Sequence, residues 1–328
     1  KIYKQHSDVS KILIGGSPYD ETTRFNKVPF PGKNKYIQNI SDFLKKRAKL
    51  NHWGYVDFNR PMVEINKREQ EADSTFTLCG GDRVHPTTNG HLVMAYLFLK
   101  AQGLSGKPVA NIAIDAMKKK VQQQENCTIS DLSVTSKGVN FTYLANSLPY
   151  PIDYGYYNGE RYSQADALKV IPFMDEMNYE GLAVSGLSDG YYLLKIEGKV
   201  IARLTAGELR RGINLASYGN TPQNEQAQKI RFMNEQRWFM EREMREYYWM
   251  EYNLMRDKGL LWASNEAAVD TMLKYRKINP FVNMLKDYWL RFMYEDVRKE
   301  NEQEQHDLVD KIYKENKPVP LKVELVKL

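Results

Sequence analysis

The chain has 328 residues, of which 42% are apolar and 27% charged, a balance typical of a folded rather than a disordered protein. Its net charge of +6 comes from 47 basic residues mixed with 41 acidic ones, and the absence of a basic stripe with interleaved aromatic residues argues against a nucleic-acid partner. No segment approaches the ~18 apolar residues that a membrane-spanning helix needs, and the two cysteines allow at most one disulfide bond.

The first hundred residues alternate between strand and helix patterns. An apolar run at 11–16 predicts a short, buried parallel strand that ends in a glycine turn, and residues 54–58 predict the next strand. Apolar residues recur at helical spacing in three segments: 34–51, 61–70 and 88–102. This order predicts the second half of a parallel α/β domain over residues 1–105, with the first half missing.

The pattern changes in residues 106–220, which we expect to form a β-rich accessory region. A helix is predicted at 109–124, and alternating segments then predict strands at 128–134, 138–146, 181–187, 190–197 and 199–204. Tight-turn dipeptides separate the last three strands, so a small antiparallel meander is expected. Thr205 and Glu208 have the spacing of a capping box that opens the next helix.

Residues 221–328 predict a region of long helices. Thr221 and Pro222 are typical of a helix start, and three helices are expected at 222–257, 264–277 and 280–305. Arg237 and Glu251 interrupt the apolar seam of the first helix, which disfavours a long free coiled coil, although these helices could support a homo-oligomer. The tail at 319–325 predicts a short closing or edge strand.

The most informative segment is residues 81–86, Gly-Asp-Arg-Val-His-Pro, which precedes an apolar helix. An aspartate three residues before a histidine, on a loop closed by proline, can direct both side chains into one site. The carboxylate can then orient the imidazole and stabilise its protonated form, as in a nucleophile-His-Asp relay. Asp82 and His85 are therefore the candidate catalytic residues, but the sequence shows no obvious nucleophile or oxyanion hole.

These residues resemble the last conserved block of the SGNH (GDSL-type) hydrolases, which supplies the catalytic aspartate and histidine of that family. Residues 12–20, Ile-Leu-Ile-Gly-Gly-Ser-Pro-Tyr-Asp, are similar to its late core strand. The resemblance covers about residues 1–105. It implies a partial flavodoxin-like, three-layer α/β domain, followed by the antiparallel β region and the helical region. The family's serine, glycine and asparagine blocks would all lie upstream of Lys1.

The resemblance implies an esterase that forms an acyl-enzyme, with acyl or acetyl esters of carbohydrates as expected substrates. His85 would deprotonate the upstream serine and Asp82 would orient His85, so this chain alone should be inactive or nearly so. No cofactor and no metal are implied. Family members that act on glycans are usually exported, which predicts a periplasmic or extracellular location, and the chain itself carries no targeting segment.

Other residues have alternative interpretations. Ser17 could replace the nucleophile but more readily caps a turn, and Cys79 is disfavoured as a thiol nucleophile because it lies behind the acid. His91 could join a zinc site, although packing in the first helical turn is favoured. A loop with Tyr154, Tyr156 and Tyr157 could stack on a glycan, whereas the aromatic residues at 247–249 are expected to pack in a helix.

Two rival functions follow from these alternatives. In the first, the protein is a non-catalytic glycan- or protein-binding protein, and its half-domain is a relic of a hydrolase. In the second, His91 contributes to a metal-dependent hydrolase.

Overall fold

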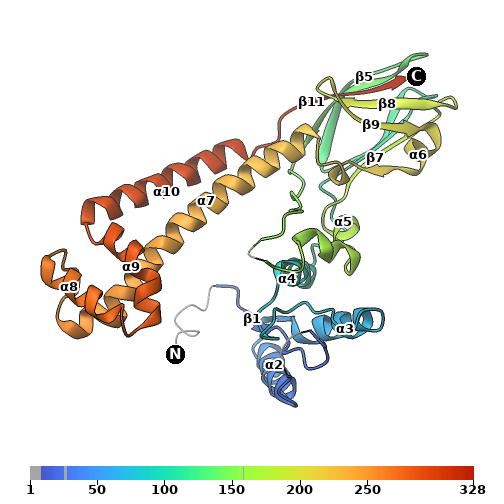
Figure 1. Ribbon diagram of the computed structural model, residues 1–328. Helices are drawn as coiled ribbons and strands as arrows, with labels where there is room; N and C mark the ends of the chain where they lie inside the picture. Colours follow the sequence, from blue (N-terminus) through green and yellow to red (C-terminus); the bar gives the residue numbers. More distant parts are fainter. Residues whose placement is uncertain (1–8, 26–27, 158) are drawn as a thin grey trace. The chain divides into compact units, whose positions relative to one another are not determined.

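The computed structural model describes residues 9–25, 28–157 and 159–328, which form two compact units, a mixed α/β unit and a helical unit. The first unit contains the residues up to Ala145, Pro149–Tyr218 and Leu321–Leu328, and the second contains Asn146–Leu148 and Gly219–Pro320. The first unit holds all the described strands, and the long helices α7 and α10 lie in the second (Figure 1). The predicted domain boundaries after residues 105 and 220 stay predictions.

The amino-terminal part of the first unit contains two parallel strands, β1 (Ile12–Gly15) and β2 (Gly54–Asp57), with Ile12 opposite Gly54. Its helices are α2 (Lys33–Leu50), α3 (Asn59–Gln70) and α4 (Thr88–Ala101). The predicted strands and helices of this part are therefore confirmed to within about two residues. Its core is formed by β2, α3 and α4 together with residues 152–177, including the short helices η1 (Gln164–Lys169) and α5 (Phe173–Glu176).

The prediction that β1 is buried is wrong. The side chains of Ile12 and Ile14 are 41% and 46% exposed. Helix α2 covers the other face of the strand, where a Cβ on Gly15 would lie 2.8 Å from Ser41 Oγ. Among the described residues β1 pairs only with β2, so the strand has the apolar sequence of a sheet interior in the position of a sheet edge.

The predicted helix at 109–124 is also wrong, because this segment forms the hairpin of β3 (Ala110–Asp115) and β4 (Lys120–Glu125). Ala110, Ile112 and Ile114 are buried while the residues between them are half-buried, which is the period of two of a strand. Lys119 has a positive φ of 52°, which turns the chain between the two strands. The tertiary burial of one face decides the structure here.

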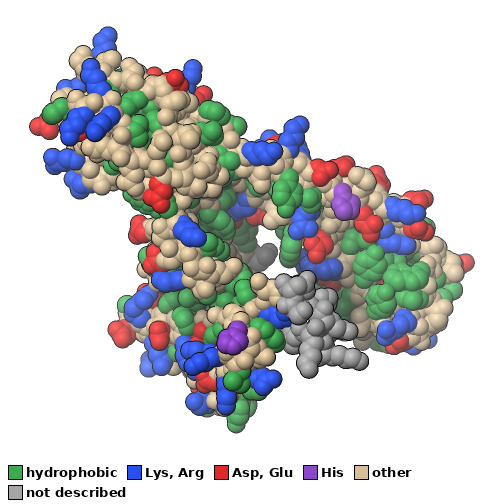
Figure 2. All heavy atoms as spheres, turned by 180° about the vertical axis from the view of Figure 1, so that it is seen from behind, with side chains coloured by type: hydrophobic (Ala, Val, Ile, Leu, Met, Phe, Trp, Pro, Cys, Tyr) green, Lys and Arg blue, Asp and Glu red, His purple; other side chains and the backbone are tan. Residues whose placement is uncertain are grey.

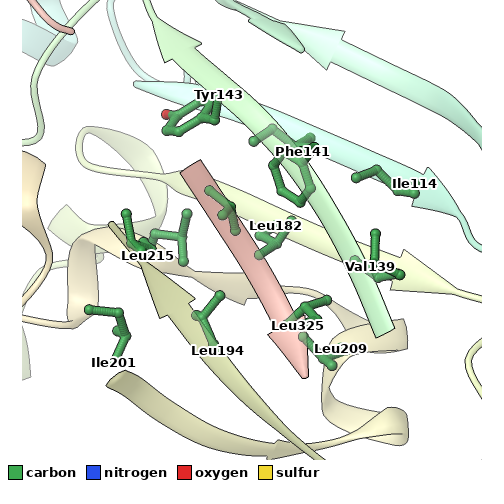
Figure 3. Close-up of a cluster of buried hydrophobic side chains, with 14 of the residues drawn as sticks. Ile114, Val139, Phe141, Tyr143, Leu182, Leu194, Ile201, Leu209, Leu215 and Leu325 are labelled. Carbon is green, nitrogen blue, oxygen red and sulfur yellow. The ribbon is translucent and has the colours of Figure 1, made fainter. Parts of the chain in front are cut away.

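Two sheets pack face to face in the carboxyl-terminal part of the first unit. The four-stranded sheet has the order β10-β7-β3-β4, and the five-stranded sheet has the order β5-β6-β11-β8-β9. The remaining strands are β5 (Cys127–Thr135), β6 (Gly138–Ala145), β7 (Glu180–Ser185), β8 (Tyr191–Ile196), β9 (Lys199–Thr205), β10 (Ile213–Asn214) and β11 (Leu321–Lys327). Leu182 of one sheet and Phe141, Leu194 and Leu325 of the other meet in a shared apolar core (Figure 3).

The last strand lies in the interior of its sheet. Strand β11 is antiparallel to both β6 and β8, and its Val323 and Leu325 side chains are almost fully buried. The sequence predicted a closing or edge strand at this position, and the edge alternative is wrong. The second unit is therefore inserted in the chain between elements of the first.

The second unit contains α7 (Pro222–Met250), α8 (Glu266–Tyr275), α9 (Pro280–Phe292) and α10 (Glu295–Glu315). Thr221 accepts a hydrogen bond from the Asn224 amide, which confirms the predicted helix start. The helix continues through a π-helical turn, η3 (Glu251–Met255), and a 3₁₀ turn, η4 (Arg256–Lys258), before Gly259 ends it with a φ of 70°. The single helix predicted at 280–305 is two helices, α9 and α10, separated by a break at residues 293–294.

The described surface is chemically mixed. Figure 2 shows basic and acidic side chains interspersed over the face that it presents, with hydrophobic side chains gathered on part of the helical unit. Apolar side chains at least half exposed in that unit include Phe232, Phe239, Ile278, Phe281 and Met284. Of the helices in the described part of the chain, none is both long and apolar enough to cross a membrane.

Candidate active site

The segment with the Asp-x-x-His motif forms a tight loop before helix α4. Cys79 and Pro86 pair as an antiparallel bridge at its base, and the Gly80 amide donates a hydrogen bond to the His85 carbonyl at 2.7 Å. At the tip, the Arg83 amide donates to the Gly80 carbonyl at 2.9 Å, and Arg83 has a left-handed conformation with a φ of 68°. A non-glycine residue in this conformation costs free energy, so the surrounding contacts must hold it there.

Asp82 and His85 contact each other directly. Asp82 Oδ2 is hydrogen-bonded to His85 Nδ1, and Asp82 Oδ1 accepts from the backbone amides of Val84 at 3.0 Å and His85 at 3.1 Å. Partial burial raises the pKa of Asp82, but the hydrogen bonds from the His85 ring and the two amides outweigh burial and lower this pKa to about 2. The carboxylate is therefore ionised at neutral pH and can only accept hydrogen bonds.

This contact fixes the orientation of the imidazole. Because an ionised carboxylate has no proton to donate, the proton in the contact must reside on Nδ1 of His85. Nε2 is then the basic nitrogen of the neutral ring. The His85 side chain is 84% exposed, so a reacting group can approach Nε2 from outside the loop.

Arg83 lies between the two candidate catalytic residues in the sequence, but its side chain points into the protein, whereas that of His85 points to solvent. Arg83 is only 2% exposed, and its Nη1 donates to the carbonyls of Asp20 and Thr23, both at 2.9 Å. In return, the Asp20 amide donates to the Arg83 carbonyl at 2.9 Å. Arg83 therefore fastens the Asp-His loop to the loop that follows β1. Sequence reasoning missed this residue, because a loop arginine is ordinarily exposed.

Helix α4 approaches the base of the Asp-His loop closely because residue 90 is glycine. A Cβ on Gly90 would lie 2.2 Å from the Leu78 carbonyl oxygen, which is too short for any side chain. The Thr87 amide and hydroxyl also donate to the Leu78 carbonyl, at 3.0 and 3.1 Å. These contacts fix the path of the chain from His85 into α4.

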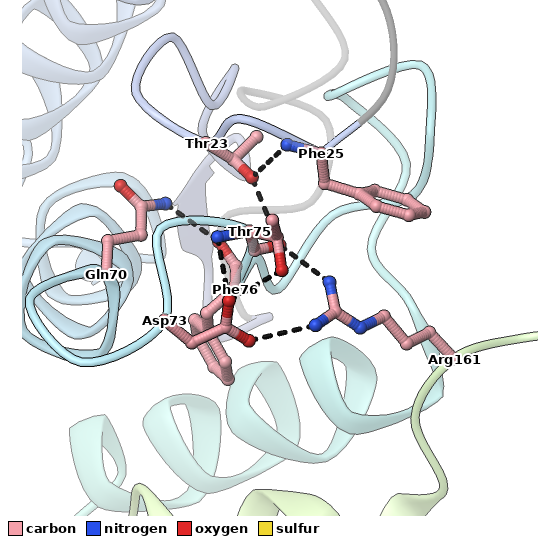
Figure 4. Close-up of polar contacts among 7 residues, drawn as sticks. All are labelled: Thr23, Phe25, Gln70, Asp73, Thr75, Phe76 and Arg161. Carbon is pink, nitrogen blue, oxygen red and sulfur yellow. Dashed lines mark hydrogen bonds and ion pairs between the residues drawn. The ribbon is translucent and has the colours of Figure 1, made fainter.

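The loop with the candidate substrate-binding tyrosines is attached to the same region. Glu160 Oε2 accepts from the Thr88 amide at 2.8 Å and from its hydroxyl at 2.5 Å, at the start of α4. Arg161 donates to Asp73 at 2.8 Å and to the Thr75 carbonyl at 2.9 Å, within a polar network shown in Figure 4. These contacts join the loop to the segment before His85, and neither glutamate nor arginine was singled out by the sequence, because both contacts span more than 70 residues.

The three tyrosines themselves are exposed. The side chains of Tyr154, Tyr156 and Tyr157 are 66%, 64% and 50% exposed. Tyr157 donates a hydrogen bond to Asp153 at 2.9 Å and Tyr156 donates to Asp166 at 3.3 Å. Their rings are accessible for stacking, and their role as substrate contacts stays a prediction.

The other candidates lie around the loop without joining the Asp-His pair. Ser17 Oγ donates to the Val84 carbonyl at 3.4 Å. Cys79 is fully buried, and burial together with the charges of Asp20 and Asp82 raises the pKa of its thiol to about 12, which leaves it protonated and unreactive. His91 is exposed on α4, and the described residues contain no group of three or more side chains suited to hold a metal.

A solved structure closely resembles the whole chain. It is described as a gut microbial diltiazem-metabolizing enzyme, is 42% identical in sequence, and superposes with a TM-score of 0.90. The match covers 100% of this chain and 75% of the other. The chain belongs to the family of this diltiazem-metabolizing enzyme.

Within this diltiazem-metabolizing family, the helical unit has a description of its own. Residues 228–317 match the family described as the diltiazem deacetylase C-terminal helical domain, a range that begins within α7 and extends just beyond α10. No curated protein matches the chain. Membership supports the expectation of a hydrolytic enzyme, while the SGNH assignment rests on the residues around Asp82 and on the strand before Ser17.

Proposed function

We propose that the protein is a hydrolase of acetyl and related acyl esters in which His85 is the general base and Asp82 the orienting carboxylate of a Ser-His-Asp relay. The observation that carries this proposal is the direct contact of an ionised Asp82 with His85 Nδ1, which leaves Nε2 exposed. The serine would be supplied by a segment of the full-length protein upstream of Lys1. Family membership and the name of the helical domain support acetyl esters as the substrate class.

An uncovered apolar surface supports the presence of such an upstream segment in the working enzyme. Ile12 and Ile14 are exposed on one face of β1, and Tyr36, Ile40 and Phe43 are 59–70% exposed along one stripe of α2. Parallel strands are normally buried on both faces by helices, so the uncovered face of β1 is a place where a further segment would pack. The solved relative, of which this chain covers 75%, has additional residues that could serve this purpose.

In this mechanism the upstream serine hydroxyl gives its proton to His85 Nε2 as its oxygen attacks the ester carbonyl. The resulting imidazolium is stabilised by the Asp82 carboxylate. His85 then returns the proton to the departing alcohol, and an acetyl-enzyme remains. Water, deprotonated by the same nitrogen, releases acetate and restores the serine. The exposed tyrosines at 154, 156 and 157 would stack on the alcohol part of the substrate, for which a carbohydrate is our proposal.

The test uses the full-length protein and p-nitrophenyl acetate. His85→Ala should lower kcat/KM by roughly 10³-fold or more, because the base is lost, and Asp82→Asn by roughly 10²-fold or more, because the wrong tautomer is favoured. His91→Ala is the matched control, since His91 is an exposed histidine of the adjacent helix, and it should retain the original rate.

The 328-residue chain should have no activity above buffer. Equal rates for His85→Ala and the unsubstituted enzyme would overturn the assignment of the base. Full activity of the 328-residue chain alone would overturn the upstream serine.

A further inference from the structure

The Asp-His pair of the proposed active site has little side-chain packing to hold it in place. The side chains of His85 and Asp82 are 84% and 44% exposed, and the contact between them orients the imidazole. Catalytic side chains normally keep their geometry because packing and further hydrogen bonds lock their rotamers. The position of this pair must therefore come from the backbone that carries it, and Arg83 lies in the middle of that backbone.

The backbone of Arg83 decides how the two side chains meet. Asp82 Oδ1 accepts from the amides of Val84 and His85 at 3.0 and 3.1 Å, and both amides follow Arg83 in the chain. These hydrogen bonds keep the carboxylate turned toward the imidazole, and they require the turn that Arg83 makes with a φ of 68°. This left-handed conformation is unfavourable for a residue with a side chain, so other contacts must maintain it.

The side chain of Arg83 supplies those contacts. Arg83 is only 2% exposed, its Nη1 donates to the carbonyls of Asp20 and Thr23, and its own carbonyl accepts from the Asp20 amide, all at 2.9 Å. The side chain and the main chain of one residue are thus bound to the same turn of the loop after β1. The tip of the Asp-His loop cannot leave that turn without breaking all three hydrogen bonds.

The turn at residues 20–23 is itself fixed to its surroundings. Asp20 Oδ1 accepts from the Thr23 amide at 3.0 Å, which closes the turn. Thr23 Oγ1 donates to the Thr75 carbonyl at 3.2 Å, and the same carbonyl accepts from Arg161 at 2.9 Å (Figure 4). Because Arg161 follows the loop with the exposed tyrosines, this turn connects the Asp-His loop to the tyrosine loop.

We propose that Arg83 is a positioning residue of the active site, whose buried guanidinium fastens the tip of the Asp-His loop to residues 20–23 and so fixes the His85 imidazole relative to the tyrosine loop. The inference rests on the proposed function, in which His85 is the base. Arg83 is directed into the protein and does not touch the reacting atoms. It acts through Asp82, whose carboxylate meets the imidazole when residue 83 keeps its turn.

The first experiment reads the tautomer of His85 in the 328-residue chain from nitrogen-15 chemical shifts, at a pH where the ring is neutral. The unsubstituted chain should carry the proton on Nδ1. Arg83→Gly adopts the left-handed conformation without strain but loses the anchor, so Asp82 should no longer hold the ring. The share of the Nδ1–H form should then fall to roughly half or less, because either nitrogen of a neutral imidazole can carry the proton.

The second experiment measures hydrolysis of p-nitrophenyl acetate by the full-length protein. Arg83→Gly should lower kcat by roughly 10–100-fold, because a small displacement of the base has a large effect on the rate. KM should change by less than about twofold, since the lost alignment matters in the transition state. Arg83→Lys should recover most of kcat and of the Nδ1–H form, because both side-chain hydrogen bonds come from one nitrogen and an ammonium group can replace it.

Arg68→Met is the matched control, because Arg68 also donates to a main-chain carbonyl, that of Val170 at 3.0 Å, but is exposed on α3. It should change neither the tautomer nor kcat, and a thermal unfolding curve of each variant confirms that it is folded.

The positioning role is overturned if Arg83→Gly keeps the Nδ1–H form, if it keeps the original kcat, or if Arg68→Met shifts the tautomer as much. Since the tautomer is read without substrate, a full-length protein with no turnover would overturn the proposed function and leave the first experiment unaffected.

Discussion

At the scale of single residues, the Asp-His loop is set by close backbone contacts as much as by its catalytic side chains. Gly90 lies in the first turn of α4, where alanine would ordinarily be preferred to glycine by up to about 1 kcal/mol. The Leu78 carbonyl oxygen reverses this preference, because the methyl carbon of an alanine at position 90 would lie only 2.2 Å from it. The same carbonyl also receives both hydrogen bonds of Thr87, so it cannot move without breaking them.

We expect Gly90→Ala to lower the free energy of unfolding by roughly 2 kcal/mol or more, because a rigid backbone must be displaced. Gly16→Ala is the matched control, since its methyl group would meet only Ile37 Cγ2 at 3.9 Å, and it should change stability by less than about 0.5 kcal/mol. Urea denaturation followed by circular dichroism measures both. Equal stabilities of the two variants would show that α4 can move away from Leu78.

At the scale of secondary-structure elements, the turn that ends the first long helix is organised around a buried carboxylate. Glu251 is fully buried in the π-helical turn. Its Oε1 accepts from Trp289 Nε1 and its Oε2 accepts from the Trp262 amide, both at 2.7 Å. Glu251 therefore joins α9 and the segment before α8 to the end of α7, and its interruption of the apolar seam has a structural cause.

Glu251→Ala should destabilise the helical unit by roughly 2–5 kcal/mol, since the buried Trp289 indole and the Trp262 amide both lose their acceptor and a cavity remains. Glu241→Ala provides the comparison, because the Glu241 side chain is 43% exposed and pairs with Arg237 and Arg245 on the surface of α7, where an ion pair contributes less than about 1 kcal/mol. Tryptophan fluorescence during urea unfolding reports on both variants. Comparable midpoints would contradict a structural role for Glu251.

Local sequence signals predicted some elements well and others poorly, for physical reasons. Thr221 with Pro222, and the capping box of Thr205, act within one turn and were confirmed. The hairpin at 110–125 was missed because its burial comes from strands that lie far away in the chain. The SGNH-like fold of the first 105 residues and the catalytic roles of Asp82 and His85 stay predictions, although the motif correctly indicated which two side chains meet.

The burial of Asn66 and the inward turn of Arg83 could not be predicted from the sequence. Each depends on which partners the fold brings to that residue: Leu78 for one side of the Asn66 amide, and the carbonyls of residues 20 and 23 for Arg83. In the sequence, nothing in the spacing of apolar residues around Asn66 or Arg83 distinguishes these two residues from exposed ones. Only the assembled loops make these contacts apparent.

At the scale of the whole molecule, the five-stranded sheet depends on the residues that follow the helical unit. Deletion of residues 321–328 removes the strand between β6 and β8 and uncovers the core around Leu194. We expect the β-sandwich to lose cooperative unfolding and the amides of β6 and β8 to lose their protection against hydrogen exchange. The helical unit should keep its own protection.

Leu328→Ala is the control, because this side chain is 61% exposed and the substitution keeps the hydrogen bond from the amide of residue 328 to the Tyr191 carbonyl, so exchange rates should stay unchanged. Hydrogen-exchange mass spectrometry resolves both units in one experiment. Undiminished protection of β6 and β8 in the deletion variant would mean that these strands pair without β11.

The interior position of β11 has a consequence for how the protein is made. A ribosome synthesises β5 to β9 first, then the entire helical unit, and only then the strand that belongs between β6 and β8. Until that strand emerges, the nascent sheet has two open edges and an uncovered core, the kind of surface that chaperones recognise and that aggregates in their absence. Residues 222–315 can form their helices before residues 321–327 are synthesised. The helical unit would therefore fold before the five-stranded sheet is complete.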